Sequence, residues 1–321
     1  LLGMVAAFGL AKDSRLAALL IITAVQAVSI WNIGIKTGAA QNMVALGFIE
    51  EKFDKTITWS EWFLYAAPFS IIMSIVLFFI MIKLIKPETD VIEGGKEVIA
   101  KQLAELGPLK GSEIRLIIIS ITLLFLWATE GALHPFDTTT VTIIAIALLL
   151  APKIGVYSWS EVERLIPWGT IIVFSVGIAL GSVLLNTQGA QWLSDTTFGT
   201  LGLDSMPLLA TIAVVTLFNI LIHLGFASAT SLASALIPVF IVLASTITAD
   251  GDQQIGFVLI QQFVISFGFL LPISAPQNML AYGTGAFTTK DFLKSGIPLT
   301  IIAYILVMIF SATYWQWIGL L

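Results

Sequence analysis

One short stretch occurs twice in this chain, as Ala39-Ala40-Gln41-Asn42-Met43-Val44-Ala45-Leu46-Gly47 and again near the other end as Ala275-Pro276-Gln277-Asn278-Met279-Leu280-Ala281-Tyr282-Gly283. We call the spacing from Ala39 to Ala275 the repeat offset. Six of the nine positions are identical, and the similarity resumes where Trp62-Phe63 and Pro68 recur as Phe292-Leu293 and Pro298. Each copy is small, polar and helix-breaking, and each lies between apolar segments. Helix interruptions at corresponding positions of two halves indicate a transporter binding site, so we expect a substrate to bind here.

The composition is that of a membrane protein. Of the 321 residues, 58% are hydrophobic and 11% charged, and the mean hydropathy is +0.99, whereas soluble domains carry about 25% charged residues. The apolar runs are about 17 to 25 residues long, enough for helices across a bilayer, and they lack the alternation of barrel strands. We therefore predict an all-α polytopic membrane protein of the cell inner (plasma) membrane, surrounded by the lipid bilayer.

The basic residues predict the topology, because short cytoplasmic loops are enriched in Lys and Arg. Lys52 and Lys55 are expected outside, and Lys36 is left inside the membrane. The other twelve are expected on the cytoplasmic side: Lys12, Arg15, Lys83, Lys86, Lys96, Lys101, Lys110, Arg115, Lys153, Arg164, Lys290 and Lys294. The chain has no nucleic-acid-binding patch, and its lack of cysteine excludes disulfides and cysteine-ligated metals.

This topology divides the chain into three parts. Residues 1–86 are the end of a first inverted repeat, with a broken helix, a last helix and, as the family resemblance given below implies, a hairpin exit arm. Residues 87–113 are a cytoplasmic amphipathic linker. Residues 114–321 are the second inverted repeat, with several helices, a re-entrant hairpin near 207–243, a broken helix at 255–287 and a last helix. The prediction is an inverted-repeat transporter with interrupted transmembrane helices, and the lone exit arm indicates that the chain begins inside a larger protein.

The motifs at the breaks resemble those of the divalent anion/sodium symporters, a family that includes the INDY-type dicarboxylate transporters. Ser228-Ala229-Thr230 is similar to the family's Ser-Asn-Thr hairpin tip. Ala275-Pro276-Gln277-Asn278 and Ala39-Ala40-Gln41-Asn42 are similar to its Thr-Pro-Pro-Asn breaks. The resemblance spans essentially the whole chain, but Ala229 replaces the tip asparagine and the first break has no proline.

The resemblance implies a function, a coupling ion and an assembly. It implies secondary active transport of small di- or tricarboxylates by elevator-type alternating access, either coupled to Na⁺ or by anion exchange. It also implies a homodimer for the full-length protein. Because Ala229 supplies no side-chain oxygen, exchange is nearly as well supported as sodium coupling.

The duplication and the resemblance together define the candidate site. We expect the substrate-binding residues to be Ser228, Ala229, Thr230, Gln41, Asn42, Pro276, Gln277, Asn278 and Lys36. Side-chain amides are good donors for carboxylates. The resemblance implies sodium ligands among Thr37, Gly38, Ser228, Ser274 and Ala275, since a hard cation prefers oxygen ligands. The structural alternative is that the amides join helices and the hydroxyls bond to helix carbonyls.

Lys36 aligns with Pro272 of the second copy. A lysine at membrane depth costs about 2.5 to 3.5 kcal/mol on insertion scales. We predict that Lys36 serves as a fixed cation beside the substrate, which would favour exchange, and the alternative is that its long side chain snorkels to an interface. Glu130 and His134 are predicted to lie near the outer face without a chemical role, and His223 is expected to be a packing residue or a proton sensor.

The sequence is also compatible with other functions. Sulfate or another divalent inorganic anion is an alternative substrate. An intramembrane hydrolase would need Ser228 within hydrogen-bond reach of His223. An anion channel would need rings of basic residues, for which Lys36 is the single candidate. We favour a carrier, and we predict that the chain is not an enzyme.

Overall fold

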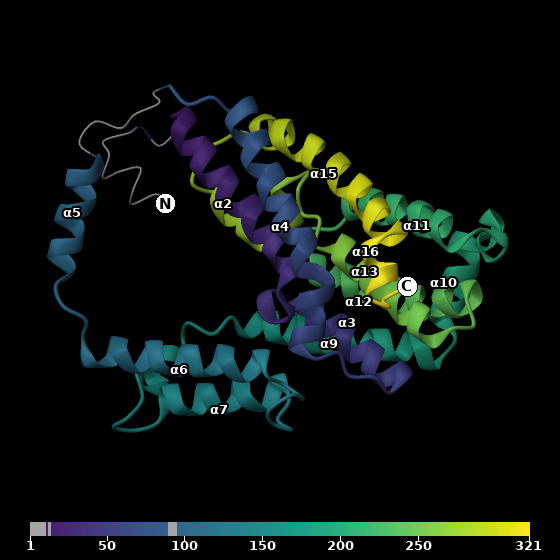
Figure 1. Cartoon of the computed structure of the whole chain (residues 1–321), viewed down its shortest axis with the longest axis horizontal. Helices are drawn as coiled ribbons and strands as arrows, with labels where there is room; N and C mark the ends of the chain where they lie inside the picture. Colours follow the sequence, from purple (N-terminus) through teal and green to yellow (C-terminus); the bar gives the residue numbers. More distant parts are fainter. Residues whose placement is uncertain (1–10, 12–13, 89–94) are drawn as a thin grey trace.

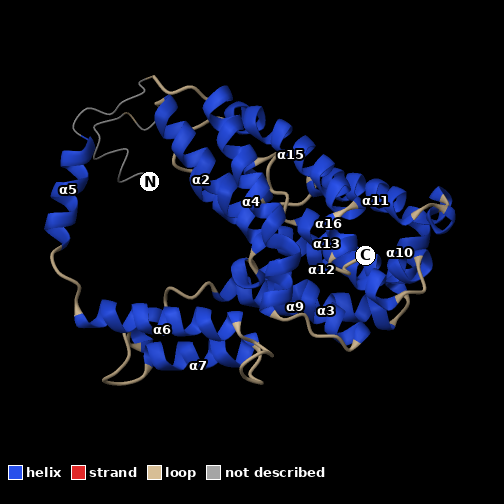
Figure 2. Cartoon of the chain, viewed as in Figure 1, coloured by secondary structure: helices blue, strands red, loops and turns tan. Residues whose placement is uncertain are grey.

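The computed structural model describes residues 11, 14–88 and 95–321. Within these residues the regular elements are helices, apart from one isolated bridge between Glu130 and His134 (Figure 2). Six of the described helices are long and apolar enough to cross a membrane, which confirms the predicted all-α polytopic class. The predicted hairpin exit arm at residues 1–10 lies outside the described residues.

The first repeat is a broken helix followed by one long helix. It comprises α2 (Arg15–Gly34), η1 (Lys36–Gly38), α3 (Ala40–Phe53) and α4 (Trp59–Leu84). After it comes α5 (Gly95–Leu106), which lies apart from the bundle in Figure 1. The side chains of Ile99, Leu103 and Leu106 on α5 are exposed, as the amphipathic pattern of the linker predicts.

The second repeat contains the remaining elements. They are α6 (Gly111–Ala128), α7 (Thr138–Leu150), α8 (Trp159–Val162), α9 (Trp168–Asn186), α10 (Gly189–Phe198), η2 (Gly199–Leu201), η3 (Leu203–Ser205), α11 (Leu208–His223), α12 (Ala229–Ile247), α13 (Gly251–Ile265), η4 (Pro272–Ser274), α14 (Pro276–Tyr282), α15 (Thr289–Ala312) and α16 (Tyr314–Trp317). The predicted hairpin corresponds to α11 and α12, which are joined at residues 224–228. The last long helix begins at Thr289.

The duplication is visible in the backbone. The short helices η1 and η4 begin one repeat offset apart, as do α3 and α14. The residues before α3 and α14 share one extended conformation, with φ −150° and ψ 145° at Ala39 and φ −151° and ψ 147° at Ala275. Thr58 and Thr288 form equivalent capping boxes at the starts of α4 and α15. The repeated residues therefore specify a repeated local backbone structure.

The two copies run in opposite directions. Lys55, after α3, forms an ion pair of 2.6 Å with Asp252 at the start of α13, and this hydrogen bond raises the pKa of Lys55 above its ordinary value. At the other end, Arg15 at the start of α2 and Asp291 in the first turn of α15, which follows α14, line one cavity. The end of α3 therefore meets the start of α13, and the start of α2 meets the end of α14. This antiparallel arrangement of the two broken helices is the one that an inverted repeat predicts.

The bundle core is built from aromatic side chains of both repeats. Trp62 on α4 contacts Phe263 on α13 with ring centroids 5.2 Å apart, and Phe263 contacts Trp315 on α16 at 5.9 Å. These three side chains are at most 2% exposed. Trp315 Nε1 also donates to the Tyr65 carbonyl on α4. Burial of such large apolar side chains packs α4 and α13 firmly around the two breaks.

The helices α6 and α7 lie side by side at the lower edge of Figure 1. No residue of α6 is buried, and its apolar side chains, such as Ile118 and Phe125, are exposed. By contrast, α12 packs against α3, α9 and α13 and is largely buried. The second half therefore contributes the buried helices α12 and α13 to the core, whereas the apolar side chains of α6 suit lipid.

Candidate functional site

The first break separates α2 from α3. Asn42 lies in the first turn of α3, and its Nδ2 donates to the carbonyls of Asn32 at 2.7 Å, Ile35 at 3.1 Å and Lys36 at 3.3 Å. These carbonyls lie where the regular hydrogen bonding of α2 ends, so they need other donors. Asn42 therefore fastens the start of α3 to the end of α2.

The second break is wider. The helix α13 ends at Ile265, and residues 266–271 are not helical before η4. Pro272 explains this, because a proline clashes with the carbonyl four residues earlier, here Gly268. The freed Gly268 carbonyl accepts a hydrogen bond of 2.7 Å from Asn278 Nδ2. Gly268 and Asn32 are themselves one repeat offset apart, so the same fastening occurs in both repeats.

This geometry changes the interpretation of the asparagines. Both were predicted to donate to substrate, but both side chains are 0% exposed, and their Nδ2 atoms are engaged within their own breaks. Asn42 Oδ1 accepts from Gln262, whereas Asn278 Oδ1 has no hydrogen-bond partner among the described residues. The contacts support the structural alternative for the amide nitrogens and leave one oxygen, that of Asn278, free to bind a ligand.

The two breaks meet, as the inverted repeat predicts. Gln41 Nε2 donates to Ser266 Oγ at 3.2 Å, from the first break to the second. Gln277 Nε2 donates to Ser29 Oγ at 3.1 Å, in the opposite direction. Glutamines at equivalent positions of the two repeats thus each donate a hydrogen bond to the other repeat. Sequence reasoning missed Gln262 and its equivalent Gln26, although the same repeat offset relates them.

The predicted hairpin tip begins α12. Ser228 is the N-cap, and its hydroxyl accepts a hydrogen bond of 3.3 Å from Ser231 N. Ala229 and Thr230 are buried in the first turn. The hydroxyls of Thr230 and of buried Ser274, in η4, have no hydrogen-bond partner within the part of the chain that the structure describes. Both hydroxyls therefore remain available to a ligand.

The candidate sodium ligands lie at the two breaks and the tip. Thr37 is half-buried and Gly38 exposed, whereas Ser274 and Ala275 are buried. Among the described residues there is no group of three or more His, Cys, Asp or Glu placed to hold a metal ion. A cation at these positions would therefore be held by hydroxyl and main-chain oxygens, which suit a hard monovalent ion.

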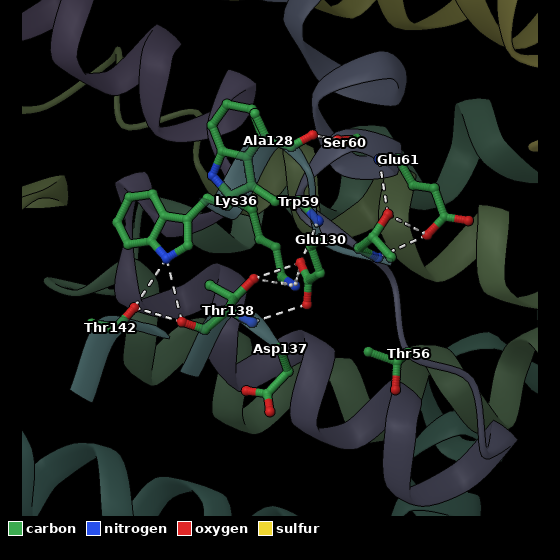
Figure 3. A network of polar contacts seen from close by, with 12 residues as sticks. Lys36, Thr56, Trp59, Ser60, Glu61, Ala128, Glu130, Asp137, Thr138 and Thr142 are labelled. Atoms are coloured by element: carbon green, nitrogen blue, oxygen red, sulfur yellow. Dashed lines mark hydrogen bonds and ion pairs between the residues drawn. The ribbon is translucent and has the colours of Figure 1, made fainter. Parts of the chain in front are cut away.

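Lys36 has a partner that the sequence did not reveal. Its side chain is 4% exposed, and its Nζ lies 3.0 Å from Thr138 Oγ1 and 3.5 Å from Glu130 Oε2. Figure 3 shows the three side chains pointing toward one another. Glu130 also accepts from the backbone N–H of Trp59 and of Thr138. Glu130 was predicted to lie near the outer face without a chemical role, and the structure gives it a structural role, because its carboxylate compensates the buried charge of Lys36.

The surroundings of Lys36 oppose anion binding. A cavity of about 370 Å³ beside it is also lined by Glu50, Glu130 and Asp137. Three carboxylates around one ammonium give the cavity a negative formal charge, which repels a carboxylate substrate. Lys36 is thus paired at the outer end of the first break, and the contacts supply no support for its predicted role as a cation beside the substrate.

The hydrolase alternative fails on geometry. Neither ring nitrogen of His223 has a hydrogen-bond partner among the described residues, although the ring lies near the main chain of Ser274. Ser228 Oγ is occupied by capping α12. A serine nucleophile needs a base within hydrogen-bond reach, and this pair does not provide it. His223 instead places the end of α11 beside the second break.

A family model described as the sodium:sulfate symporter transmembrane region matches residues 2–321. The chain belongs to this family of divalent anion/sodium symporters. The membership agrees with the motifs at the breaks and the tip, and it confirms a multi-pass protein of the inner membrane. The family is one of transporters, which agrees with the prediction that the chain is not an enzyme.

The relatives of this chain differ in the activity that their names give. A membrane protein of Cupriavidus necator is 46% identical over 319 residues, covering 99% of this chain and 62% of that protein. The sodium-dependent dicarboxylate transporter SdcS of Staphylococcus saprophyticus is 24% identical, covering 88% of this chain and 56% of that protein. The citrate/succinate antiporter of Escherichia coli is 26% identical, and the match covers 81% of this chain and 52% of that protein. The chain thus spans a little over half the length of these relatives.

Proposed function

We propose that this chain forms the substrate-carrying part of a secondary active transporter for small di- or tricarboxylates. The observation that carries the proposal is the antiparallel pair of interrupted helices, which Gln41 joins by donating to Ser266 at the second break and Gln277 by donating to Ser29 on α2. Substrate and ion sites of inverted-repeat carriers lie between such broken helices. The names of the relatives, a dicarboxylate transporter and a citrate/succinate antiporter, support carboxylates as the substrate class.

The proposed substrate contacts come from the hairpin tip and the second break. Thr230 and Ser274 offer hydroxyl donors that no described residue occupies. The N-termini of α3 and α12 add a partial positive charge of about half an elementary charge each. In this proposal Gln41, Asn42 and Gln277 shape the site, whereas Ser228, Ala229 and Pro276 line the starts of α12 and α14. The joined breaks would move together in an elevator-type cycle.

We further propose that transport is coupled to Na⁺. A dianion that crosses the membrane needs compensating positive charge, and Lys36 is already neutralised by Glu130. Oxygens of Ser274, Ala275 and Ser228, together with Asn278 Oδ1, are the ligands we assign to the ion. The same pairing of Lys36 removes the one candidate for a basic ring, so an anion channel is less well supported than a carrier.

Counterflow in liposomes tests these proposals. The protein is reconstituted in liposomes loaded with unlabelled succinate, citrate or sulfate, and uptake of the labelled anion is measured with Na⁺ outside or replaced by choline. We expect saturable uptake of a carboxylate that is stimulated by internal carboxylate and reduced several-fold without Na⁺. Uptake of sulfate that excess carboxylate does not inhibit would support the inorganic-anion alternative instead, and uptake unaffected by Na⁺ would support exchange.

A further inference from the structure

Two glutamines outside the predicted site occupy equivalent positions in the two repeats. Gln26 lies on α2 and Gln262 on α13, and the side chains of both are 0% exposed. They are separated by the repeat offset, the same spacing that relates the breaks. Both lie in apolar helices ahead of a break, where an aliphatic side chain would be the ordinary choice.

Each glutamine reaches the break of the other repeat. Gln26 Nε2 donates to the Phe269 carbonyl at 3.1 Å, and Gln262 Nε2 donates to Asn42 Oδ1 at 3.1 Å. Phe269 follows Gly268, whose carbonyl is held by Asn278. Two consecutive carbonyls of the second break are therefore held by side chains, one of them from the opposite repeat.

The bond from Gln262 orients the fastening of the first break. Because Asn42 Oδ1 accepts from Gln262, the amide of Asn42 is turned so that its Nδ2 faces the carbonyls that end α2. The three carbonyls face Nδ2 and Gln262 satisfies Oδ1, so both ends of the Asn42 amide are held in place. Gln262 thus acts on the break through Asn42.

Both glutamines lower the stability of the folded protein by burying an unpaired oxygen, which packing alone does not explain. Gln26 Oε1 and Gln262 Oε1 have no hydrogen-bond partner among the described residues. A buried polar atom without a partner is destabilising, whereas an apolar side chain of similar volume would avoid the cost. The same residue with the same unpaired oxygen occurs in both repeats, which points to a task in the shape of the breaks.

We propose that Gln26 and Gln262 are positioning residues, each of which holds the break of the opposite repeat in the shape that binds substrate. This inference rests on the proposed carboxylate transport. Gln26 fixes the main chain that leads to Ser274, and Gln262 fixes the side chain that closes the first break. Neither glutamine touches the substrate, so its loss changes affinity through the geometry of other groups.

The test compares Gln26→Met and Gln262→Met with a matched control. Methionine keeps the unbranched shape and removes the amide. Gln261→Met is the control, because Gln261 is also on α13 and 0% exposed, but its amide donates to Thr216 Oγ1 on α11. Binding of labelled succinate and citrate to the purified protein is measured together with the melting temperature. We expect at least a fivefold loss of affinity in the two positioning variants and less than twofold in the control.

A second measurement separates positioning from general packing. Gln262→Met in an Asn42→Ala background should cause little further loss of affinity, because Gln262 acts through Asn42. Unchanged affinity in both methionine variants overturns the inference and leaves the proposed function standing. Failure of both variants to fold, with Gln261→Met folded, also overturns it, since the glutamines would then serve folding. If the parent protein binds neither carboxylate, the proposed function fails and the inference fails with it.

Discussion

Lys36 Nζ lies 3.5 Å from Glu130 Oε2, although the two residues are 94 positions apart in sequence. Both side chains are at most 6% exposed, and Thr138 Oγ1 bridges them by accepting from Lys36 and donating to Glu130. The turn between α6 and α7 is thereby tied to the first break, and Trp59 N binds the same carboxylate. A lysine that sequence alone presents as a lone charge is part of a closed ionic network (Figure 3).

We predict that breaking this pair from either side costs stability. Removing one partner of a buried ion pair leaves an unpaired charge, at a typical cost of about 3 to 5 kcal/mol. Lys36→Met and Glu130→Gln should each destabilise by about this amount, and the double variant by less than the sum. Chemical unfolding in detergent measures the cycle.

The control for the ion pair is at the outer end of the bundle. Lys55 and Asp252 form an exposed pair, so Lys55→Met should cost less than about 1 kcal/mol. A Lys36→Met variant with parental stability and lowered carboxylate affinity would show that Lys36 contacts substrate, as the sequence alone predicts.

A second prediction separates the two asparagines. Asn42 makes several hydrogen bonds through both ends of its amide, whereas Asn278 makes one and leaves Oδ1 unpaired among the described residues. At about 1 kcal/mol net for each hydrogen bond, Asn42→Ala should destabilise more than Asn278→Ala. Asn278→Ala should have the larger effect on sodium-dependent binding, because it removes a free oxygen. Melting temperatures measure the loss of stability in the two variants, and binding titrations with and without Na⁺ measure their sodium dependence. Equal effects of Na⁺ in the two variants would contradict the assignment of Asn278 Oδ1 as a sodium ligand.

The breaks were predictable because their causes are local. Pro272, Pro276 and the repeated Gln-Asn pair fix the second break, and the identity between copies locates the first. The positions of Lys55 and Arg15 fixed the two ends of the bundle, since charges at helix ends must reach water.

The role of each amide was not predictable. An asparagine amide is an equally good donor to a carboxylate and to a main-chain carbonyl, and only the course of the chain decides between them. Asn42 faces carbonyls freed within its own break, so its amide nitrogen donates to the main chain and not to a substrate. Glu130 was missed because nothing local links a turn residue to a lysine in another repeat. Gln26 and Gln262 could have been found, because they share the offset of the repeated stretch.

A third prediction tests the hairpin tip. Ser228 caps α12, and a serine N-cap replaced by alanine costs about 0.5 to 2 kcal/mol, whereas glycine costs only a few tenths. Ser228→Ala should therefore destabilise more than Ser228→Gly. If the hydroxyl also serves substrate or Na⁺, both variants should lose affinity alike.

Thr58→Ala is the matched control for this cap, because Thr58 caps α4 at the outer end. It should lower the melting temperature without changing affinity. Parental affinity in Ser228→Gly would leave Ser228 with a capping role only.

The last prediction tests the elevator-type movement with disulfides, for which the chain is convenient because it contains no cysteine. Lys55 and Asp252 join the ends of α3 and α13 within the proposed moving unit. Gly177 on α9 faces Ser234 on α12, where a Cβ added at Gly177 would meet the serine side chain. Because the lysine side chain spans most of the gap in this pair, Lys55→Cys and Asp252→Cys are joined with a short bis-methanethiosulfonate reagent, which reduction removes. We expect this cross-link to leave counterflow within about twofold of the reduced protein, because α3 and α13 move together in the proposed cycle. A cross-link in Gly177→Cys/Ser234→Cys should abolish counterflow reversibly, because in the proposed elevator-type cycle α12 moves with the breaks and slides past α9, which we assign to the static part of the protein. Each cross-link is measured before and after reduction in the same liposomes. Full transport with the α9–α12 cross-link intact would rule out sliding at this boundary, and loss of transport with the first cross-link would show that the two broken helices move relative to each other.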